Sequence, residues 1–191
     1  MKILNIPGMR SAGEGTKARV LREAFPKAEV ISPDIPITAP EAMALLGEIV
    51  ERERPDVVVG TSMGAMLAQK LRGVPKVLAN PAFHVSQIMR QNIGTVEFCK
   101  PRKDGATHYE ITTQMCDEYE ALEATQFDGL DDTERRITFG LFGDNDDVVD
   151  CRQEFLDNYG PYATFPGTHR FTAADIRRYI VPLILKALET K

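Results

Sequence analysis

The chain has 191 residues, of which 43% are hydrophobic and 27% are charged, with three cysteines, three histidines and no tryptophan. This composition is typical of a soluble globular protein, and the length suits a single domain. The cysteines Cys99, Cys116 and Cys151 are odd in number and widely spaced, which predicts neither a disulfide framework nor a zinc site. A formal net charge of −5 argues against nucleic acid as a partner.

The chain also lacks sequence signals for export or membrane insertion. The N-terminal segment reaches a turn at Pro7-Gly8, which leaves no room for the apolar region of a signal peptide. No apolar run approaches the roughly 20 residues that a membrane span requires. We therefore expect a cytoplasmic protein.

Short apolar runs predict six β-strands. Each run is continuous rather than alternating and is followed by a turn-forming residue, as in parallel strands that are buried on both faces. The runs cover residues 3–6, 28–31, 57–60, 76–79, 137–142 and 162–165.

Helical patterns alternate with these strands. They cover residues 16–25, 40–53, 63–71, 151–159 and 173–188, and we expect a kink at Pro182 in the last one. Such alternation predicts an α/β fold, a doubly wound three-layer sandwich with the strand order 2-1-3-4-5-6. In that order a ligand crevice forms where the first and third strands end.

One segment breaks the alternation. Residues 84–136 separate two strands, and they contain a basic loop, a helical pattern over residues 112–124 and an acidic turn. This insertion in the single domain of residues 1–191 is either a long crossover or a small helical cap over a site at the carboxyl edge of the sheet.

The strongest local motif is Gly60-Thr61-Ser62-Met63-Gly64, which lies between a predicted strand and a predicted helix. A G-x-S-x-G sequence in this context is typical of a nucleophile elbow, a strained turn that exposes a serine hydroxyl. The alternatives are a glycine-rich packing turn or a phosphate-binding loop. Because the motif lacks the ending of a P-loop and the spaced glycines of a dinucleotide site, we favour Ser62 as a nucleophile.

A serine hydroxyl is a weak nucleophile until a neighbouring base accepts its proton, and that base is usually a histidine held by a carboxylate. His84 precedes every candidate carboxylate, and His108 lies in the charged insertion. His169 leaves the last predicted strand, so we expect it at the same sheet edge as Ser62. The orienting acid should follow the strand 137–142, where the candidates are Asp144, Asp146 and Asp147.

The remaining candidate residues surround Ser62. The backbone N–H of Met63 follows the nucleophile at a helix N-terminus, and that of Met9 lies in the loop after the first strand; together they form a candidate oxyanion hole. We expect no metal site and no cofactor. The residues expected to contact substrate are Gly8, Arg10, Phe83 and His84.

These motifs resemble the α/β-hydrolase superfamily, and over nearly the whole chain they resemble its small YqiA/YcfP-type esterases. The shared features are the Pro-Gly-Met turn with a lysine at position 17, the serine elbow, Leu78-Ala-Asn-Pro-Ala82, the insertion, and the segments 143–150 and 167–171. The resemblance implies a cofactor-free serine esterase or thioesterase for short acyl esters. It selects Asp146 as the acid, through a G-x-x-D-x-V-V turn, to act with Ser62 and His169.

The chain departs from this family at two positions. Pro7 stands where the family usually has histidine, and Thr168 stands where it usually has aspartate.

Two other functions stay open: a catalytically silent binding protein of the same fold, and an amidase or peptidase. Arg10 and the basic loop at residues 100–103 could contact an anionic substrate tail or form a solvated surface.

Overall fold

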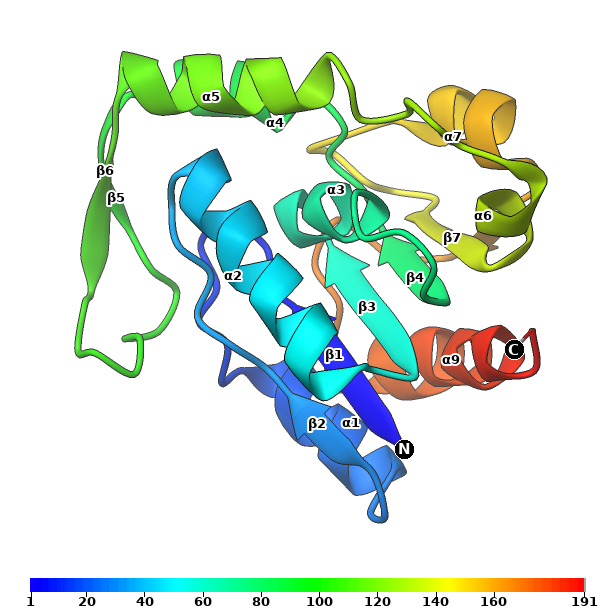
Figure 1. The fold of residues 1–191 in the computed structure, drawn as a ribbon. Helices are drawn as coiled ribbons and strands as arrows, with labels where there is room; N and C mark the ends of the chain where they lie inside the picture. The colour runs from blue at the N-terminus through cyan, green and yellow to red at the C-terminus, as the bar shows by residue number, and fades with distance from the viewer. Residues whose placement is uncertain (191) are drawn as a thin grey trace.

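The computed structural model describes residues 1–190, which form a six-stranded sheet in the order β2-β1-β3-β4-β7-β8 (Figure 1). All adjacent strands are parallel, so the predicted doubly wound sheet and its strand order are confirmed. The strands are β1 (Lys2–Ile6), β2 (Glu29–Ile31), β3 (Val57–Thr61), β4 (Lys76–Ala79), β7 (Thr138–Gly143) and β8 (Ala163–Phe165).

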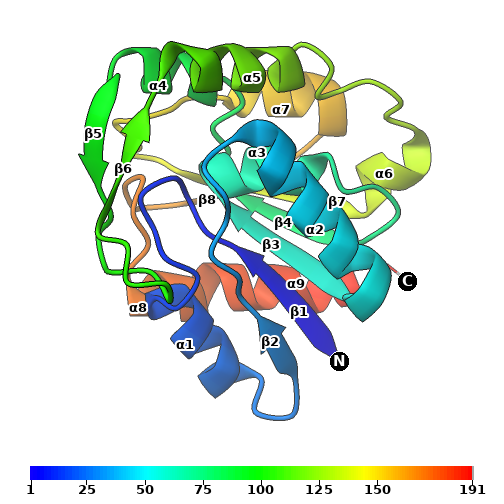
Figure 2. The same cartoon turned by 60° about the vertical axis from the view of Figure 1, so that its left-hand side comes forward.

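Helices cover both faces of the sheet, which gives three layers (Figure 2). Val58 of β3 belongs to the apolar core on one face, whereas Val57 and Val59 belong to the core on the other face. This burial on both faces explains why the strands are continuous apolar runs. The helices of the first face are α2 (Ala39–Glu53), α3 (Met63–Gln69) and α7 (Arg152–Tyr159); the second face carries α1 (Thr16–Ala24) and α9 (Val181–Leu188).

The predicted C-terminal helix is built from three pieces. A short α8 (Ala173–Asp175) leads into the π-helical turn η1 (Ile176–Ile180), and α9 follows with Pro182 in its first turn. Proline has no N–H to bond back along the helix, so the wider turn lies where regular α-helical hydrogen bonding is interrupted. Within the described residues, no helix is both long enough and apolar enough to cross a membrane.

The insertion between β4 and β7 contains more structure than its sequence predicts. Its elements are α4 (Val85–Arg90), β5 (Gly94–Glu97), β6 (His108–Ile111), α5 (Thr113–Glu123) and α6 (Asp132–Arg136). The predicted helix at residues 112–124 is confirmed as α5, capped by the Thr112 hydroxyl. The antiparallel β5-β6 hairpin was not predicted, because its strands are four residues long and alternate between exposed and covered positions.

The β5-β6 hairpin reaches back to the first loops of the chain (Figure 2). The Cys99 N–H donates to the carbonyl of Arg10 over 2.8 Å, and Arg10 Nε donates to the carbonyl of Glu97 over 3.0 Å. In the hairpin turn, the Lys103 N–H donates to Asp34 Oδ2 over 2.8 Å. The insertion is thereby fixed beside the loop that follows β1.

Candidate active site

Ser62 lies on a sharp turn between β3 and α3. Its backbone angles, φ 57° and ψ −123°, fall in a region that non-glycine residues rarely occupy. A side chain at position 60 would collide with the backbone of Gly64 and Ala65, and one at position 64 with the carbonyls of Ile6 and Pro7 at the end of β1. The two glycines therefore let the strand, the helix and the first loop approach closely, which leaves Ser62 at the tip.

His169 brings a base to Ser62 from the loop after β8. Its Nε2 lies 2.9 Å from Ser62 Oγ, and its Nδ1 lies 2.8 Å from Asp146 Oδ2. The imidazole is largely covered, with 14% of its side chain exposed. These two contacts align the three residues as a serine, a base and an orienting acid.

Asp146 is held in the turn after β7 by its own backbone. Its Oδ1 accepts hydrogen bonds from the N–H groups of Val148, over 2.9 Å, and Val149, over 3.0 Å. Burial opposes ionisation of this carboxyl, but the hydrogen bonds from His169, Val149 and Val148 outweigh burial and lower its pKa. Asp144 and Asp147 are exposed, and neither forms a hydrogen bond to His169 in the described structure.

Asn80 connects the two loops that carry Asp146 and His169. This fully buried side chain donates from Nδ2 to the carbonyls of Thr168, over 3.1 Å, and His169, over 3.2 Å. Its Oδ1 accepts from the N–H of Gly143 over 2.8 Å. The sequence signal for this residue is an asparagine before Pro81 at a strand end, within the Leu78–Ala82 segment that carries the family resemblance. The resemblance implies no role for it.

The candidate oxyanion donors lie on both sides of Ser62. Met63 is the first residue of α3, so its N–H precedes the intrahelical hydrogen bonds. Gly8 comes close to Ser62, since a Cβ at position 8 would lie 3.3 Å from Ser62 Cβ. Met9 follows Gly8 in the same loop, and Arg10 connects this loop to the hairpin. The loop that carries Pro7 is thus held by the insertion.

A cavity of about 520 Å³ opens over Ser62 and His169. The loop after β1 provides one wall, including Gly8, Met9 and Arg10. The insertion provides another wall, formed by Val85, Ile88, Asn92, Val96, Cys99 and Lys100. A volume of this size is typical of a site for a small molecule.

Two expected substrate contacts lie away from this cavity. Phe83 is fully buried and packs edge to face against Phe127, with 5.1 Å between the ring centroids. His84 Nε2 lies 2.9 Å from Glu154 Oε2, next to α7. Both residues follow β4, but the turn after that strand directs them toward α7 and the acidic turn of the insertion rather than toward Ser62.

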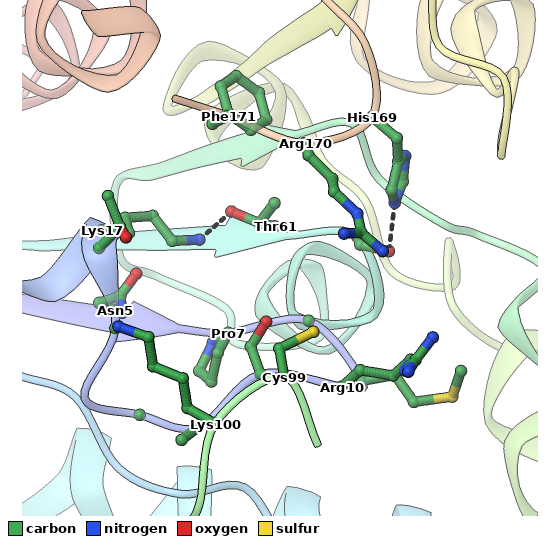
Figure 3. Close-up of a pocket in the computed structure, with 18 of the residues that line it drawn as sticks. Asn5, Pro7, Arg10, Lys17, Thr61, Cys99, Lys100, His169, Arg170 and Phe171 are labelled. Carbon is green, nitrogen blue, oxygen red and sulfur yellow. Dashed lines mark hydrogen bonds between the residues drawn. The ribbon is translucent and has the colours of Figure 1, made fainter. Parts of the chain in front are cut away.

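Lys17 lines the cavity, although its sequence pattern predicts no role for it. It lies in the first turn of α1 and donates from Nζ to Thr61 Oγ1 (Figure 3). Burial lowers the pKa of Lys17 to about 7. A sequence signal existed, because cations are disfavoured at helix N-termini, where the helix dipole is positive.

Several solved structures share this fold at low sequence identity. A monoacylglycerol lipase from Paleococcus ferrophilus has a TM-score of 0.70 and 10% identity, with 100% of this chain and 95% of that chain covered. The mouse alpha/beta hydrolase domain-containing protein 10 has a TM-score of 0.67 and 17% identity, with coverage of 100% and 90%. A thioesterase domain from the curacin biosynthetic pathway has a TM-score of 0.61 and 15% identity, with coverage of 96% and 90%.

These similarities establish the fold, and the sequence establishes the family. No curated protein matches the chain. Residues 2–185 match the family described as "Uncharacterised protein family (UPF0227)". The chain is therefore a member of the UPF0227 family with an α/β-hydrolase fold.

Proposed function

We propose that this protein is a serine hydrolase that cleaves short acyl esters or thioesters through Ser62, His169 and Asp146. The observation that carries the proposal is the continuous set of contacts from Ser62 Oγ to His169 Nε2, at 2.9 Å, and from His169 Nδ1 to Asp146, at 2.8 Å. The strained backbone of Ser62 supports it, since such strain is typical of nucleophile elbows.

The first half of the proposed reaction forms an acyl-enzyme. Ser62 Oγ attacks the acyl carbon while His169 Nε2 accepts the hydroxyl proton. The ionised Asp146 accepts the hydrogen bond from Nδ1–H and stabilises the imidazolium that forms. The imidazolium then protonates the leaving alcohol or thiol, and the C–O or C–S bond breaks.

The second half releases the acid. A water molecule gives a proton to His169 and attacks the acyl carbon, and the same imidazolium returns that proton to Ser62 Oγ. In both halves, negative charge develops on the former carbonyl oxygen. The backbone N–H groups of Met63 and Met9 are the proposed donors to that oxygen, a contribution of about 10² to 10³ in rate for one donor.

The cavity supports a small substrate. Its volume of about 520 Å³ suits a short acyl chain, and the insertion at residues 84–136 forms part of its wall. We therefore propose that the insertion is a cap that limits the acyl chain and shields the site from water. The proposed chemistry needs no cofactor, because the nucleophile, base and oxyanion donors all come from the chain.

Activity-based labelling tests the nucleophile. A fluorophosphonate probe should label the protein at Ser62, located by mass spectrometry of the peptides, and Ser62→Ala should abolish labelling. Ser11→Ala is a matched control because Ser11 also lines the cavity. A folded protein that resists the probe would point to the catalytically silent binding protein instead.

A substrate panel tests the reaction class. We expect turnover of 4-nitrophenyl acetate and butyrate that falls steeply for octanoate and longer chains, since the cavity is small. S-acyl-N-acetylcysteamine thioesters of the same lengths compare the two leaving groups. Cleavage of the matching 4-nitroanilides at a rate comparable with that of the esters would favour an amidase and contradict the proposal.

A further inference from the structure

Lys17 is a cation placed inside the cavity without an anionic partner. Among the described residues, its only hydrogen bond is to Thr61 Oγ1, and no carboxylate forms an ion pair with it. Burying an ammonium group without a carboxylate carries a free-energy cost. A site that keeps such a group is organised to receive an anion that the chain itself does not supply.

The surroundings of Lys17 reinforce this positive character. Arg10, Lys100 and Arg170 also line the cavity, whereas Glu14 provides the one carboxylate among the described residues of the lining. Glu14 is already engaged by Arg22, through two hydrogen bonds of 2.6 and 2.7 Å. The hydrogen bond from Arg22 lowers the pKa of Glu14 although partial desolvation opposes the shift, so the charge of Glu14 is compensated by Arg22.

The N-terminus of α1 contributes to the same end of the cavity. Gly15, Thr16, Lys17 and Ala18 all line it, and the N-cap Gly15 has no side chain to accept from the free N–H groups. The first turn of α1 also contains no acidic residue. The positive end of the helix dipole therefore acts in the same direction as the Lys17 charge.

The position of Lys17 relative to the base identifies which part of the substrate it meets. Lys17 contacts Thr61, the residue before Ser62, and His169 approaches from the other side of the site (Figure 3). In the proposed reaction the leaving group departs toward His169, which protonates it. A group bound by Lys17 therefore belongs to the acyl half of the substrate.

We propose that Lys17 is a specificity-determining residue that binds a second carboxylate on the acyl group, so that the preferred substrates are half-esters or half-thioesters of short dicarboxylic acids. This proposal rests on the serine hydrolase function proposed above. It names the substrate class of the same site. Lys17 binds substrate and takes no part in proton transfer at the ester.

A matched pair of esters tests the proposal. 4-Nitrophenyl hydrogen glutarate and 4-nitrophenyl methyl glutarate differ only in a methyl group on the distal carboxylate. We expect kcat/KM to be at least about 10-fold higher for the anionic ester, and this ratio to fall about 10-fold or more in Lys17→Met. Lys27→Met is the control, since Lys27 is exposed in the turn after α1, and it should leave the ratio unchanged. A merely structural effect of Lys17→Met would lower both rates together.

The pH dependence of the same ratio provides a second readout. The other titratable groups that line the cavity are Arg10, Glu14, Cys99, Lys100, His169 and Arg170. An effect of pH that is common to both esters cancels in the ratio, whereas loss of the Lys17 proton affects only the anionic ester. Because the pKa of Lys17 is lowered to about 7, the ratio should fall between pH 6 and 8.5, and it should be flat in Lys17→Met.

A binding measurement separates failure of this proposal from failure of the hydrolase function. In calorimetry with Ser62→Ala, monomethyl glutarate should bind at least about 10-fold more tightly than dimethyl glutarate, and Lys17→Met in the same background should remove the difference. Equal binding of the two compounds, or an ester ratio near one, overturns the role of Lys17 even if Ser62 reacts with the probe. A third outcome also overturns the role of Lys17. Lys17→Met would change the rate of acetyl-CoA hydrolysis relative to that of S-acetyl-N-acetylcysteamine but leave the glutarate ratio unchanged. That outcome would assign the bound anion to the leaving group.

Discussion

In the proposed triad, Asp146 is connected to Ser62 only through the His169 imidazole between them. Asp146→Asn keeps the size of the side chain but can present an N–H to His169 Nδ1, which stabilises the tautomer with its proton on the nitrogen that faces Ser62. We expect kcat to fall by about 10⁴ with little change in the denaturation midpoint. Ester hydrolysis and thermal unfolding measure the two quantities. Asp147→Asn is the control because Asp147 is exposed on the same turn; equal losses in both variants would contradict this role of Asp146.

Asn80 holds the loop of the proposed base, His169, and has no hydrogen bond to Ser62 or to the imidazole among the described residues. Asn80→Asp keeps the acceptor for the Gly143 N–H but replaces the donor to two carbonyls with a carboxylate oxygen that repels them. We expect the loop of His169 to shift, kcat to fall about 10- to 100-fold and KM to change little. Slower fluorophosphonate labelling would report the same shift. A variant that is merely unstable, with an unchanged rate per folded molecule, would contradict the positioning role.

The sequence predicts a site residue where a single local pattern is enough to identify that residue. Ser62 follows from two flanking glycines between a strand and a helix, and His169 follows from the small number of histidines and its place after the last strand. Asn80 and Lys17 make their contacts with segments distant in the chain, so the local signals at these positions, an asparagine before a proline and a cation at a helix N-terminus, do not indicate which groups they contact. Phe83 was expected at the cavity because it follows a strand, yet it packs against Phe127.

At the scale of elements, Asp34 fastens the β5-β6 hairpin to the body of the protein. Its carboxylate accepts from the N–H groups of Gly13, over 2.6 Å, and Lys103, over 2.8 Å, and so joins the hairpin turn to the loop before α1. Burial opposes ionisation of Asp34, but these two N–H groups and the nearby Arg102 lower its pKa overall. The Asp34 carboxylate thus fastens the turn of the hairpin, whereas the contacts of Arg10 fasten its strand ends.

Asp34→Ala should loosen this part of the insertion. Loss of a hydrogen-bonded carboxylate costs about 1–3 kcal/mol, so local opening should rise by about 5- to 150-fold. We expect faster first cleavage by trypsin within residues 100–103, mapped by mass spectrometry, and a higher KM. Asp132→Ala removes an exposed carboxylate from the far end of the insertion and should have no such effect. Equal cleavage rates for wild type and Asp34→Ala would show that other contacts hold the hairpin.

The sequence predicts the elements of the sheet better than those of the insertion. Parallel strands such as β3 and β4 are buried on both faces, so their apolar runs are unambiguous. The hairpin strand β5 alternates between exposed and partly covered positions, and its place is set by the Arg10 and Asp34 contacts. A weak pattern fixed by tertiary contacts cannot be recognised from sequence alone.

Across the whole molecule, two lysines whose pKa values are lowered by desolvation lie at opposite edges of the sheet. Lys76 begins β4 at the amino edge, fully buried, and its Nζ lies 2.7 Å from Glu134 Oε2. Burial lowers the pKa of Lys76 although Glu134 opposes the shift. Lys17 lies at the carboxyl edge beside Ser62 and has no such carboxylate among the described residues. The charge of Lys76 is compensated by Glu134, whereas the charge of Lys17 has no carboxylate partner among the described residues.

Substitution of the two lysines by methionine should therefore change stability in opposite directions. Lys76→Met leaves the Glu134 carboxylate buried without its cation, and we expect the free energy of unfolding to fall by about 3–5 kcal/mol. Lys17→Met removes a desolvated charge, and at pH 6 we expect the free energy of unfolding to rise by about 1–3 kcal/mol. Denaturant unfolding of both variants measures these changes.

The pH dependence of unfolding distinguishes whether Lys17 destabilises the fold through its charge or stabilises the fold through its packing. The pKa of Lys17 is about 7 in the folded protein and near 10.5 when the chain is unfolded, so between these values the unfolded state binds the extra proton. Stability of the wild type should therefore rise with pH across this window, and the advantage of Lys17→Met should shrink from pH 6 to pH 9. If Lys17→Met instead unfolds more easily than wild type at pH 6, Lys17 stabilises the fold. If Lys17→Met is more stable than wild type at pH 6, the fold tolerates an unfavourable charge beside Ser62, as expected for a group kept to bind substrate.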